Sequence, residues 1–235
     1  MTVSMPAPQD SPAYQAAEAA RILGLPAGTV RAWCFGHDYV GRNDRQRHRF
    51  QPVIEPVDVA GKLLSFGNLC ELHVLAAIRR RHGVHMPKVR RAIDYVSREL
   101  GVERPLANAQ FSTNGIDLFV KAAGTLLNVA EQGQQAMRAD FERALTRIEF
   151  GAAGGPLLLF PYTRPGDRAA LQPRTVVVDP LRSFGRPVIA FAYVRTEVIN
   201  DRFRAGDSAQ EMAEDYRVGI QDIEEALRFE GRRAA

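Results

Sequence analysis

The sequence has little cysteine and no long hydrophobic run. Its 235 residues include two cysteines, Cys34 and Cys70, and neither belongs to a CxxC pair. Two separated thiols cannot form a disulfide framework, so we expect both to be reduced in a cytoplasmic protein. The longest apolar runs, such as 157–160, are far too short to cross a bilayer, and the start lacks the regions of a signal peptide. We therefore expect neither export nor a membrane anchor.

The signatures of common enzymes are also missing. The chain contains no P-loop, no GxSxG and no HExxH sequence. A glycine-rich segment at 151–155 follows an expected helix instead of a strand, so it predicts a linker and not a phosphate-binding loop. A low-complexity tail that could fold upon a partner is absent as well. These absences favour a protein that acts by binding, without catalysis and without a cofactor.

The composition is that of a folded protein with an uneven charge distribution. Apolar residues make up 46% of the chain and charged residues 25%, and the length allows two or three modules. The net charge is +4 for the whole chain but +5 for residues 1–104, and residues 31–91 hold 12 basic and 5 acidic residues. Such a basic segment would suit a polyphosphate partner, although a solvated helix face is the simpler alternative.

The spacing of small and apolar residues at 14–36 predicts a helix-turn-helix. Two closely crossing helices need a small residue at their contact, and Ala20 meets this need. Gly24 stands four residues later, where the turn requires a left-handed backbone. Val30 and Trp33 lie three apart and would face the first helix. Helical hairpins that bind no DNA share this spacing, but the adjoining basic segment favours a DNA-binding motif.

A polar, basic segment, GRNDRQRHRF at 41–50, follows the second helix and predicts a hairpin or wing. Alternate residues of a strand share one face, so residues 45, 47 and 49 could face phosphates together. A flexible, solvated loop is the alternative. The candidate DNA-binding residues are Thr29 and Arg31 on the second helix and Arg42, Arg45, Arg47 and Arg49 in the wing. Further phosphate contacts could come from Arg79, Arg80, Arg81, Lys88, Arg90 and Arg91.

The rest of the chain predicts an α+β fold that is mainly helical. Helices are expected at 68–81 and 87–100, and another carries the stripe Met137, Phe141, Leu145 and Ile148. Strands are expected at 157–160, 175–178 and 188–194. The expected parts are a flexible leader (1–12), a winged helix-turn-helix domain (13–104), a mixed middle region (105–172) and a C-terminal strand pair with a second helix-turn-helix (173–235).

The second helix-turn-helix begins at Ser208, which forms a capping-box pattern with Glu211. Its apolar spacing repeats that of the first, but Arg217 occupies the position of Gly24. Its surface is acidic and would repel phosphate, so we expect it to contact protein, either a second copy or a toxin. The candidate partner or dimer residues are Glu211, Glu214, Glu224 and Glu225. An ordinary solvated acidic face is the alternative.

One group of residues has the composition of a zinc site. It consists of Cys70, His73, His82 and His85, in the pattern CxxHx8HxxH. Cys70 and His73 lie on an expected core-facing helix, where both residue types commonly pack as buried side chains. We therefore expect no metal.

The order of parts in the first hundred residues resembles the MerR-like winged helix-turn-helix. The resemblance is carried by YQAAEAARILGLPAGTVRAW, a wing, and LSFGNLCELHVLAAIRRRHGV. The C-terminal segment looks like a small domain often found in antitoxins, through Asp179-Pro180, Gly185-Arg186-Pro187, Gly206-Asp207 and residues 213–216. In that family Gly-Thr usually follows the Pro-Val-Ile strand, whereas Ala192-Tyr193 stand here.

Together these parts are similar to VapB-type antitoxins. The resemblance implies a protein that neutralises a PIN-fold ribonuclease toxin and represses its own operon, as a homodimer on double-stranded DNA. Two half-sites would lie one helical turn, about 34 Å, apart. The alternatives are a MerR-like ligand- or metal-responsive transcriptional regulator and a protein-interaction module that does not bind DNA. The sequence identifies neither the operator nor the toxin.

Overall fold

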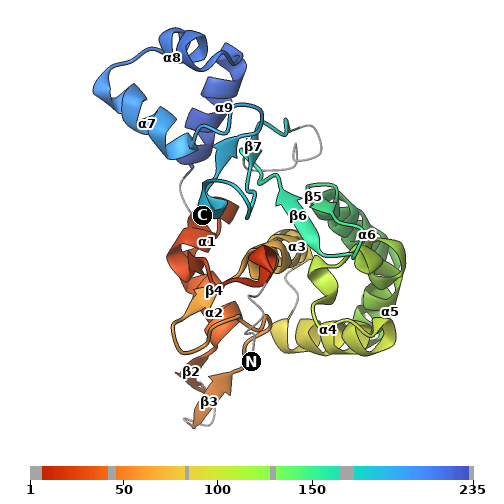
Figure 1. Cartoon of the computed structure of the whole chain (residues 1–235). Helices are drawn as coiled ribbons and strands as arrows, with labels where there is room; N and C mark the ends of the chain where they lie inside the picture. The colour runs from red at the N-terminus through yellow and green to blue at the C-terminus, as the bar shows by residue number, and fades with distance from the viewer. Residues whose placement is uncertain (1–6, 42–45, 83–84, 128–130, 165–171, 233–235) are drawn as a thin grey trace, which may run out of the picture.

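The computed structural model describes residues 7–41, 46–82, 85–127, 131–164 and 172–232. Six helices of this part of the chain belong to the N-terminal and middle regions: α1 (Ala16–Leu23), α2 (Ala27–Phe35), α3 (Phe66–His82), α4 (Met86–Leu100), α5 (Ile116–Leu127) and α6 (Glu131–Leu145). The C-terminal helices are α7 (Thr196–Ala205), α8 (Ala209–Tyr216) and α9 (Ile220–Glu230). Figure 1 shows α7, α8 and α9 together at one end of the molecule.

The described strands are short and pair antiparallel. The pairs are β1 (Tyr14–Gln15) with β4 (Leu63–Leu64), β2 (His37–Val40) with β3 (Arg47–Phe50), β5 (Ile148–Phe150) with β6 (Pro156–Leu159), and β7 (Val176–Val177) with β8 (Val188–Ile189). The fold is therefore α+β and mainly helical, as predicted.

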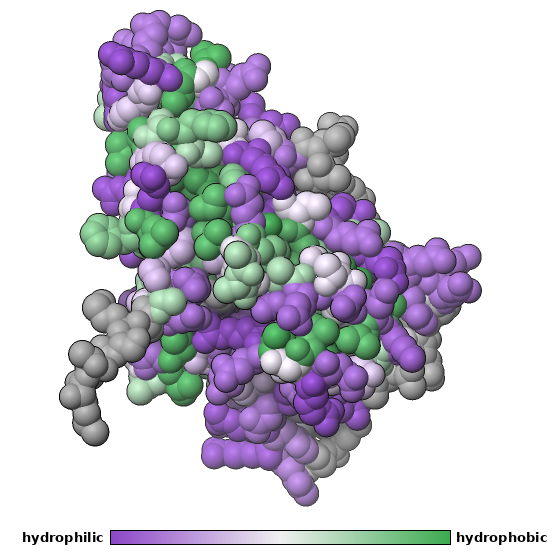
Figure 2. All heavy atoms as spheres, turned by 45° about the vertical axis from the view of Figure 1, so that its right-hand side comes forward, coloured by the Kyte–Doolittle hydropathy of each residue, from purple (hydrophilic) through white to green (hydrophobic). Residues whose placement is uncertain are grey.

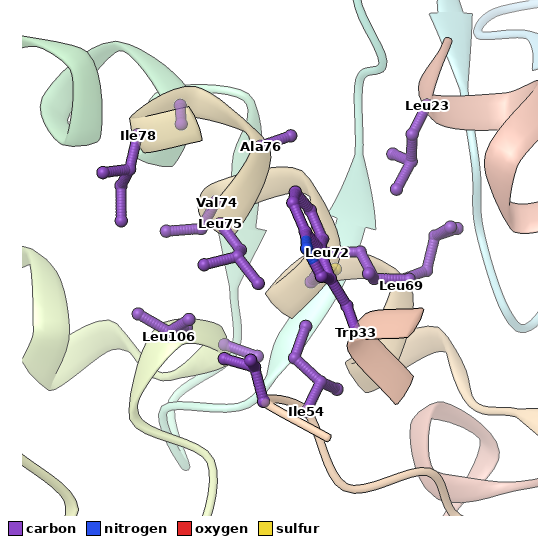
Figure 3. Close-up of a cluster of buried hydrophobic side chains, with 14 of the residues drawn as sticks. Leu23, Trp33, Ile54, Leu69, Leu72, Val74, Leu75, Ala76, Ile78 and Leu106 are labelled. Carbon is purple, nitrogen blue, oxygen red and sulfur yellow. The ribbon is translucent and has the colours of Figure 1, made fainter. Parts of the chain in front are cut away.

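A single hydrophobic core joins the N-terminal and middle regions around α3. Figure 3 shows the indole of Trp33 extending from α2 toward α3, beside Leu72. In the same core, the rings of Phe111, Phe119 and Phe141 meet edge to face, with centroids 5.0 to 6.3 Å apart. The domain boundary expected at 104 and 105 falls inside this shared core.

Part of the expected flexible leader is folded. Residues Pro8–Asp10 form a short 3₁₀ helix, η1, that packs against α3. The carboxylate of Asp10 accepts a hydrogen bond from Arg104 Nη1 at 2.7 Å. Within the expected leader, residues 7–12 thus include a short helix with an ion pair to Arg104 and a contact with α3. Residues 1–6 lie outside the described part of the chain.

The glycine-rich segment 151–155 joins β5 to β6 in a hairpin and is not a linker between domains. The Gly151 amide donates to the Gly155 carbonyl at 2.9 Å, and Gly154 adopts a φ of +82°. A left-handed residue is needed for this tight reversal, which explains the glycine. Ile148, expected as the end of a helical stripe, lies on β5 because α6 ends at Leu145.

The C-terminal module has its own small core. Its buried apolar residues are Ile189, Ile199, Met212, Ala213, Ile223 and Ala226. The sequence analysis did not predict α7, whose residue Ile199 enters this core. The strand expected at 188–194 ends at Ile189, because the Tyr193 amide donates back to the Ile189 carbonyl at 2.8 Å in a tight turn. The strand expected at 175–178 likewise shortens to β7.

The C-terminal module contacts the first helix-turn-helix directly. The buried Tyr14 hydroxyl donates to the Gly185 carbonyl at 2.9 Å, and Arg186 forms an ion pair with Glu18 of α1. Arg232, after α9, donates to the Ile22 carbonyl at 3.0 Å. The face of the molecule in Figure 2 has its apolar residues concentrated toward the middle, between more hydrophilic ends. No helix among the described residues is long and apolar enough to span a membrane.

Candidate DNA-binding interface

Helices α1 and α2 form the predicted helix-turn-helix. Gly24 ends α1 with a φ of +62°, and the Leu25 amide donates to the Ala20 carbonyl at 2.9 Å. This closure is an αL helix cap, which L residues with a side chain adopt only with strain. Ala20, Val30 and Trp33 are buried between the helices and α3, as their spacing predicted. The local fold therefore follows from the residues that the sequence analysis named.

The outward face of α2 carries few and small side chains apart from one arginine. Gly28 and Arg31 are exposed, and Thr29 is half-buried. No hydrogen bond of the Arg31 guanidinium to another described residue occurs, so its donors face solvent. A guanidinium can bind a phosphate or the O6 and N7 atoms of guanine through two parallel hydrogen bonds. The small neighbours would let α2 approach a groove closely.

The predicted wing is an antiparallel hairpin formed by β2 and β3. Its register pairs Asp38 with Arg49 and Val40 with Arg47, so these four side chains share one face. Arg47 and Arg49 are both exposed on that face, in agreement with the expected alternation. The carboxylate of Asp38 lies 3.5 Å from Arg49 Nη1. Arg42 and Arg45, also predicted to bind DNA, lie outside the described residues.

The opposite face of the wing is aromatic, which the sequence analysis missed. The ring of His37 stacks on Phe50 with centroids 5.2 Å apart, and Tyr39 stacks on His48 at 5.5 Å. The rings stand two residues apart on each strand, and this alternation in the sequence could have revealed the aromatic face. The stacked rings stiffen the hairpin and leave Tyr39 48% exposed. The wing therefore has one face that carries Arg47 and Arg49, the basic face, and one aromatic face.

The base of the wing is fastened to α2 and α4. A Cβ on Gly36, whose φ is +68°, would lie 2.3 Å from the Phe50 carbonyl oxygen. The Val53 amide donates to the Trp33 carbonyl at 2.7 Å. From α4, Arg90 donates to the carbonyls of Pro52 at 2.9 Å and Gln51 at 2.7 Å, and its guanidinium carbon lies 6.0 Å from the Phe50 ring centroid.

These contacts change the role expected for Arg90. Its guanidinium is occupied by protein carbonyls, so it holds the wing and is not free to bind phosphate. Among the other basic residues considered with it, Arg91 is exposed and Lys88 is half-buried. The side chains of residues 79–81 lie outside the described part of the chain.

The second helix-turn-helix, formed by α8 and α9, repeats the geometry of the first. Arg217 adopts φ 54° and ψ 44°, where Gly24 adopts 62° and 42°. The Val218 amide donates to the Ala213 carbonyl at 3.0 Å, the counterpart of the bond that closes the first turn. A capping box between Ser208 and Glu211 starts α8, as predicted. When the two motifs are aligned so that Arg217 corresponds to Gly24, Glu224 falls at the position of Arg31.

Three of the four predicted acidic contact residues are exposed on this second motif. Glu211 belongs to the capping box, Glu214 accepts a hydrogen bond from Gln210 at 2.7 Å, and Glu224 lies 3.2 Å from Arg228. The capping hydrogen bonds from Ser208 lower the pKa of Glu211 below its ordinary value. The carboxylates of Glu211, Glu214 and Glu224 lie at the surface, although Arg228 partly compensates the charge of Glu224.

Glu225 does not belong to that surface, which corrects the expectation. Only 2% of it is exposed, because α9 turns this residue toward the loop that precedes β7. Its carboxylate binds Arg164 at 2.7 Å and Arg228 at 2.7 Å, and it accepts a hydrogen bond from Thr163. Burial opposes ionisation, but these three donors outweigh it and hold the pKa of Glu225 below its ordinary value. Glu225 is therefore a structural anchor of α9.

The residues with zinc-like spacing are not brought together. Cys70 is fully buried, and burial raises the pKa of its thiol well above the ordinary value, so it stays protonated. His73 is buried on α3 with Nε2 3.1 Å from the Ala144 carbonyl, whereas His85 is exposed before α4. The side chain of His82 lies outside the described residues. Within the described part of the chain, no three potential ligands gather at one point.

Two family models match separate parts of the chain. One, described as "Putative DNA-binding HTH domain", matches residues 12–93. This range contains α1, α2 and the wing. The other, described as "Protein of unknown function (DUF433)", matches residues 176–229, a range that holds α7, α8 and all but the last residue of α9. The description of the first model therefore agrees with the N-terminal helix-turn-helix, whereas that of the second names no structural feature.

Two proteins of Mycobacterium tuberculosis (strain ATCC 25618 / H37Rv) are similar over nearly the whole length. "Putative antitoxin VapB45" is 29% identical over 234 residues, which cover 93% of each chain. "Uncharacterized protein Rv2308" is 25% identical over 225 residues, which cover 94% of this chain and 90% of that protein. The crystal structure of Rv2018 from Mycobacterium tuberculosis has a TM-score of 0.64 and 23% identity, covering 92% of this chain and 98% of that one. That likeness shows a shared overall fold.

Proposed function

We propose that the protein is the antitoxin of a type II toxin-antitoxin system, and that it binds operator DNA and neutralises a PIN-fold ribonuclease toxin. The observation that carries the DNA part is the contrast between the two motifs. At equivalent positions of the second helix, the first motif exposes Arg31 and the second exposes Glu224. Only the first offers the positive charge that phosphates attract. The similarity to a protein named as an antitoxin supports the toxin part.

In the proposed complex, α2 enters the major groove and the wing lies along the adjacent backbone. Thr29 and Arg31 would contact base edges or phosphates, and Arg47 and Arg49 would contact phosphates from the basic face of the wing. Arg42 and Arg45, which lie outside the described residues, are proposed to contact phosphates as well. Arg49 would exchange Asp38 for a phosphate, since their 3.5 Å contact is exposed and weak.

The acidic surface of the second motif would contact protein. Glu211, Glu214 and Glu224 present carboxylates that repel DNA, so a basic surface on the toxin is the proposed partner. By occupying its operator, the antitoxin would repress its own operon. A homodimer would recognise two half-sites about 34 Å apart on one face of the duplex. The protein would act by binding, without turnover.

DNA binding is tested by fluorescence anisotropy with the promoter region of the chain's own operon. Arg31→Ala should weaken binding about tenfold or more, and the slope of log K against log salt should fall by about one phosphate contact. Arg204→Ala is the matched control, because Arg204 is an exposed arginine on α7 of the C-terminal module. Equal binding by wild type and Arg31→Ala would exclude α2 as the contacting helix.

The toxin is tested by co-expression with the products of neighbouring genes, followed by pull-down and a ribonuclease assay. We expect a small partner whose nuclease activity is inhibited at equimolar antitoxin. Reversal of the acidic surface, Glu211→Lys with Glu214→Lys, should release the partner without abolishing DNA binding. DNA binding without any partner would instead leave a transcriptional regulator, and the antitoxin proposal would be rejected.

A further inference from the structure

The C-terminal module carries an exposed aromatic patch that the proposed function does not use. We define it by four large apolar residues, Leu181, Phe184, Phe191 and Tyr193, which are 75%, 93%, 88% and 41% exposed. They come from two loops on either side of β8. The guanidinium carbon of Arg182 lies 4.1 Å from the Tyr193 ring centroid and joins the loops. Aromatic residues with arginine are the composition of interface hot spots.

The backbone under the patch is strained. Ser183, Phe184 and Tyr193 have φ values of 48°, 54° and 55°. Among the described residues, only two others that are not glycine share this left-handed conformation, Lys62 and Arg217. Glycine or asparagine would adopt it with less strain than phenylalanine or tyrosine. Strain of this kind is typical of functional loops, and here it accompanies aromatic rings that gain nothing from burial within the chain.

The first loop of the patch is also held rigidly. The Gly185 carbonyl accepts a hydrogen bond from the buried Tyr14 hydroxyl at 2.9 Å, and the next residue, Arg186, pairs with Glu18 of α1. A Cβ on Gly185 would lie 2.2 Å from the Tyr14 hydroxyl oxygen, so this approach requires glycine. The backbone next to Phe184 is therefore anchored before any partner binds, which lowers the entropic cost of association.

The charges next to the patch have both signs. Arg195 stands two residues after Tyr193, and Glu197 and Asp201 lie on consecutive turns of α7. All three are exposed, and none forms an ion pair with another described residue. A two-fold axis through an apolar centre with such a rim would place the arginine of one copy against the carboxylates of the other. A uniformly charged partner would match only part of this rim.

We propose that the aromatic patch is a homodimer interface, in which Phe184 and Phe191 of one copy pack against those of a second copy. Arg195 of each copy faces Glu197 of the other. The loop of Phe184 is bonded to Tyr14 and Glu18, so the two first helix-turn-helix motifs flank the two-fold axis. This proposal rests on the homodimer of the proposed function and locates its interface, and its test needs neither a toxin nor DNA.

The test is sedimentation velocity of the purified full chain over a range of micromolar concentrations. Wild type should sediment as a dimer, and Phe184→Asn or Phe191→Asn should raise the dissociation constant at least tenfold. Asparagine suits a left-handed backbone, so Phe184→Asn should preserve the loop. The matched control is Phe203→Gln, which removes an exposed phenylalanine of α7, 51% exposed, outside the patch. It should leave the dimer unchanged.

A charge exchange tests the two-fold arrangement. Arg195→Glu and Glu197→Arg should each weaken the dimer, and the double variant should restore it, because the pairs across the axis are re-formed with reversed sign. A monomeric wild type would overturn the proposal. A dimer unaffected by the two phenylalanine variants would also overturn it. So would the finding that the patch binds a toxin and does not bind a second copy of the chain. Circular dichroism of each variant excludes unfolding as the cause.

Discussion

Arg21 on α1 and Glu230 on α9 form an ion pair, with 2.7 Å between Nη1 and Oε2. These residues lie 209 positions apart in the chain. Glu230 also accepts a hydrogen bond from Thr196 Oγ1 at 2.5 Å, so one carboxylate links α1, α7 and α9. The helix that positions the DNA-facing surface is therefore bonded directly to the C-terminal module.

A double-mutant cycle measures this link. Arg21→Ala and Glu230→Gln should each lower the free energy of unfolding, and the coupling energy between them should be about 0.5 to 1 kcal/mol, because the arginine is partly solvated. The measurement is urea unfolding of the four proteins at low salt. Arg98→Ala, an exposed arginine on α4, serves as the control. A coupling energy of zero would mean that solvent screens the pair completely.

Arg90 should affect DNA binding through the wing and not through a phosphate. Arg90→Ala removes the donors to Gln51 and Pro52, so we expect faster hydrogen exchange at the amides of 47–53 and weaker DNA binding. The salt dependence of binding should keep its slope, since no phosphate contact is lost. Arg31→Ala should show the reverse: unchanged exchange in the wing and a smaller slope. An unaltered exchange pattern in Arg90→Ala would contradict the anchoring role.

The sequence predicts the local motifs of this fold well, and the reason is steric. Gly24, Val30 and Trp33 constrain a helix-turn-helix through contacts close in sequence, and the hairpin of the wing follows from alternation within ten residues. The same spacing found the second motif although Arg217 replaces a glycine. In both places the determining contacts are local.

Contacts between distant segments escape such patterns. Glu225 and Glu224 are adjacent acidic residues on α9, yet one is 2% exposed while the side chain of the other is 47% exposed. The difference depends on Arg164, 61 positions away, whose approach no local pattern encodes. Arg90 likewise cannot be told apart from neighbouring basic residues such as Arg91 in the sequence. It anchors the wing because the carbonyls of Gln51 and Pro52, which are distant in sequence, accept its hydrogen bonds.

These two glutamates provide a matched pair for stability. Glu225→Gln should lower the free energy of unfolding by about 2 kcal/mol, since it leaves buried donors without their charged acceptor. Glu224→Gln should change it by less than about 0.5 kcal/mol. Because the pKa of Glu225 is lowered by folding, its stabilisation is present above the unfolded pKa and is lost as pH falls through the folded one. Equal effects of both substitutions would refute the burial of Glu225.

A second buried carboxyl, Glu71, lies on α3 beneath the first helix-turn-helix. Asn68 Nδ2 donates to its Oε2 at 3.0 Å, and the oxygen of the same amide accepts from the backbone of Val57 and Ser65. Burial raises the pKa of Glu71 to about 7, although Asn68 and Arg104 act in the opposite direction. Together with burial, its charge raises the pKa of the Cys34 thiol on α2 to about 12.

The raised pKa makes stability fall as pH rises. Between about pH 4.5 and 7 the folded protein keeps a proton on Glu71 that the unfolded chain loses, so up to about 3 kcal/mol of stability disappears across this window. Glu71→Gln stays neutral and keeps the acceptor for Asn68, so it should match wild type near pH 4.5 and exceed it near pH 8. Urea unfolding of both proteins at intervals from pH 4.5 to 8 measures the difference between their free energies of unfolding. Because both proteins contain the same histidines, the contribution of the histidines cancels in this difference. A difference that stays constant over this range would show that Glu71 is ionised in the folded protein throughout, with solvent reaching the carboxylate.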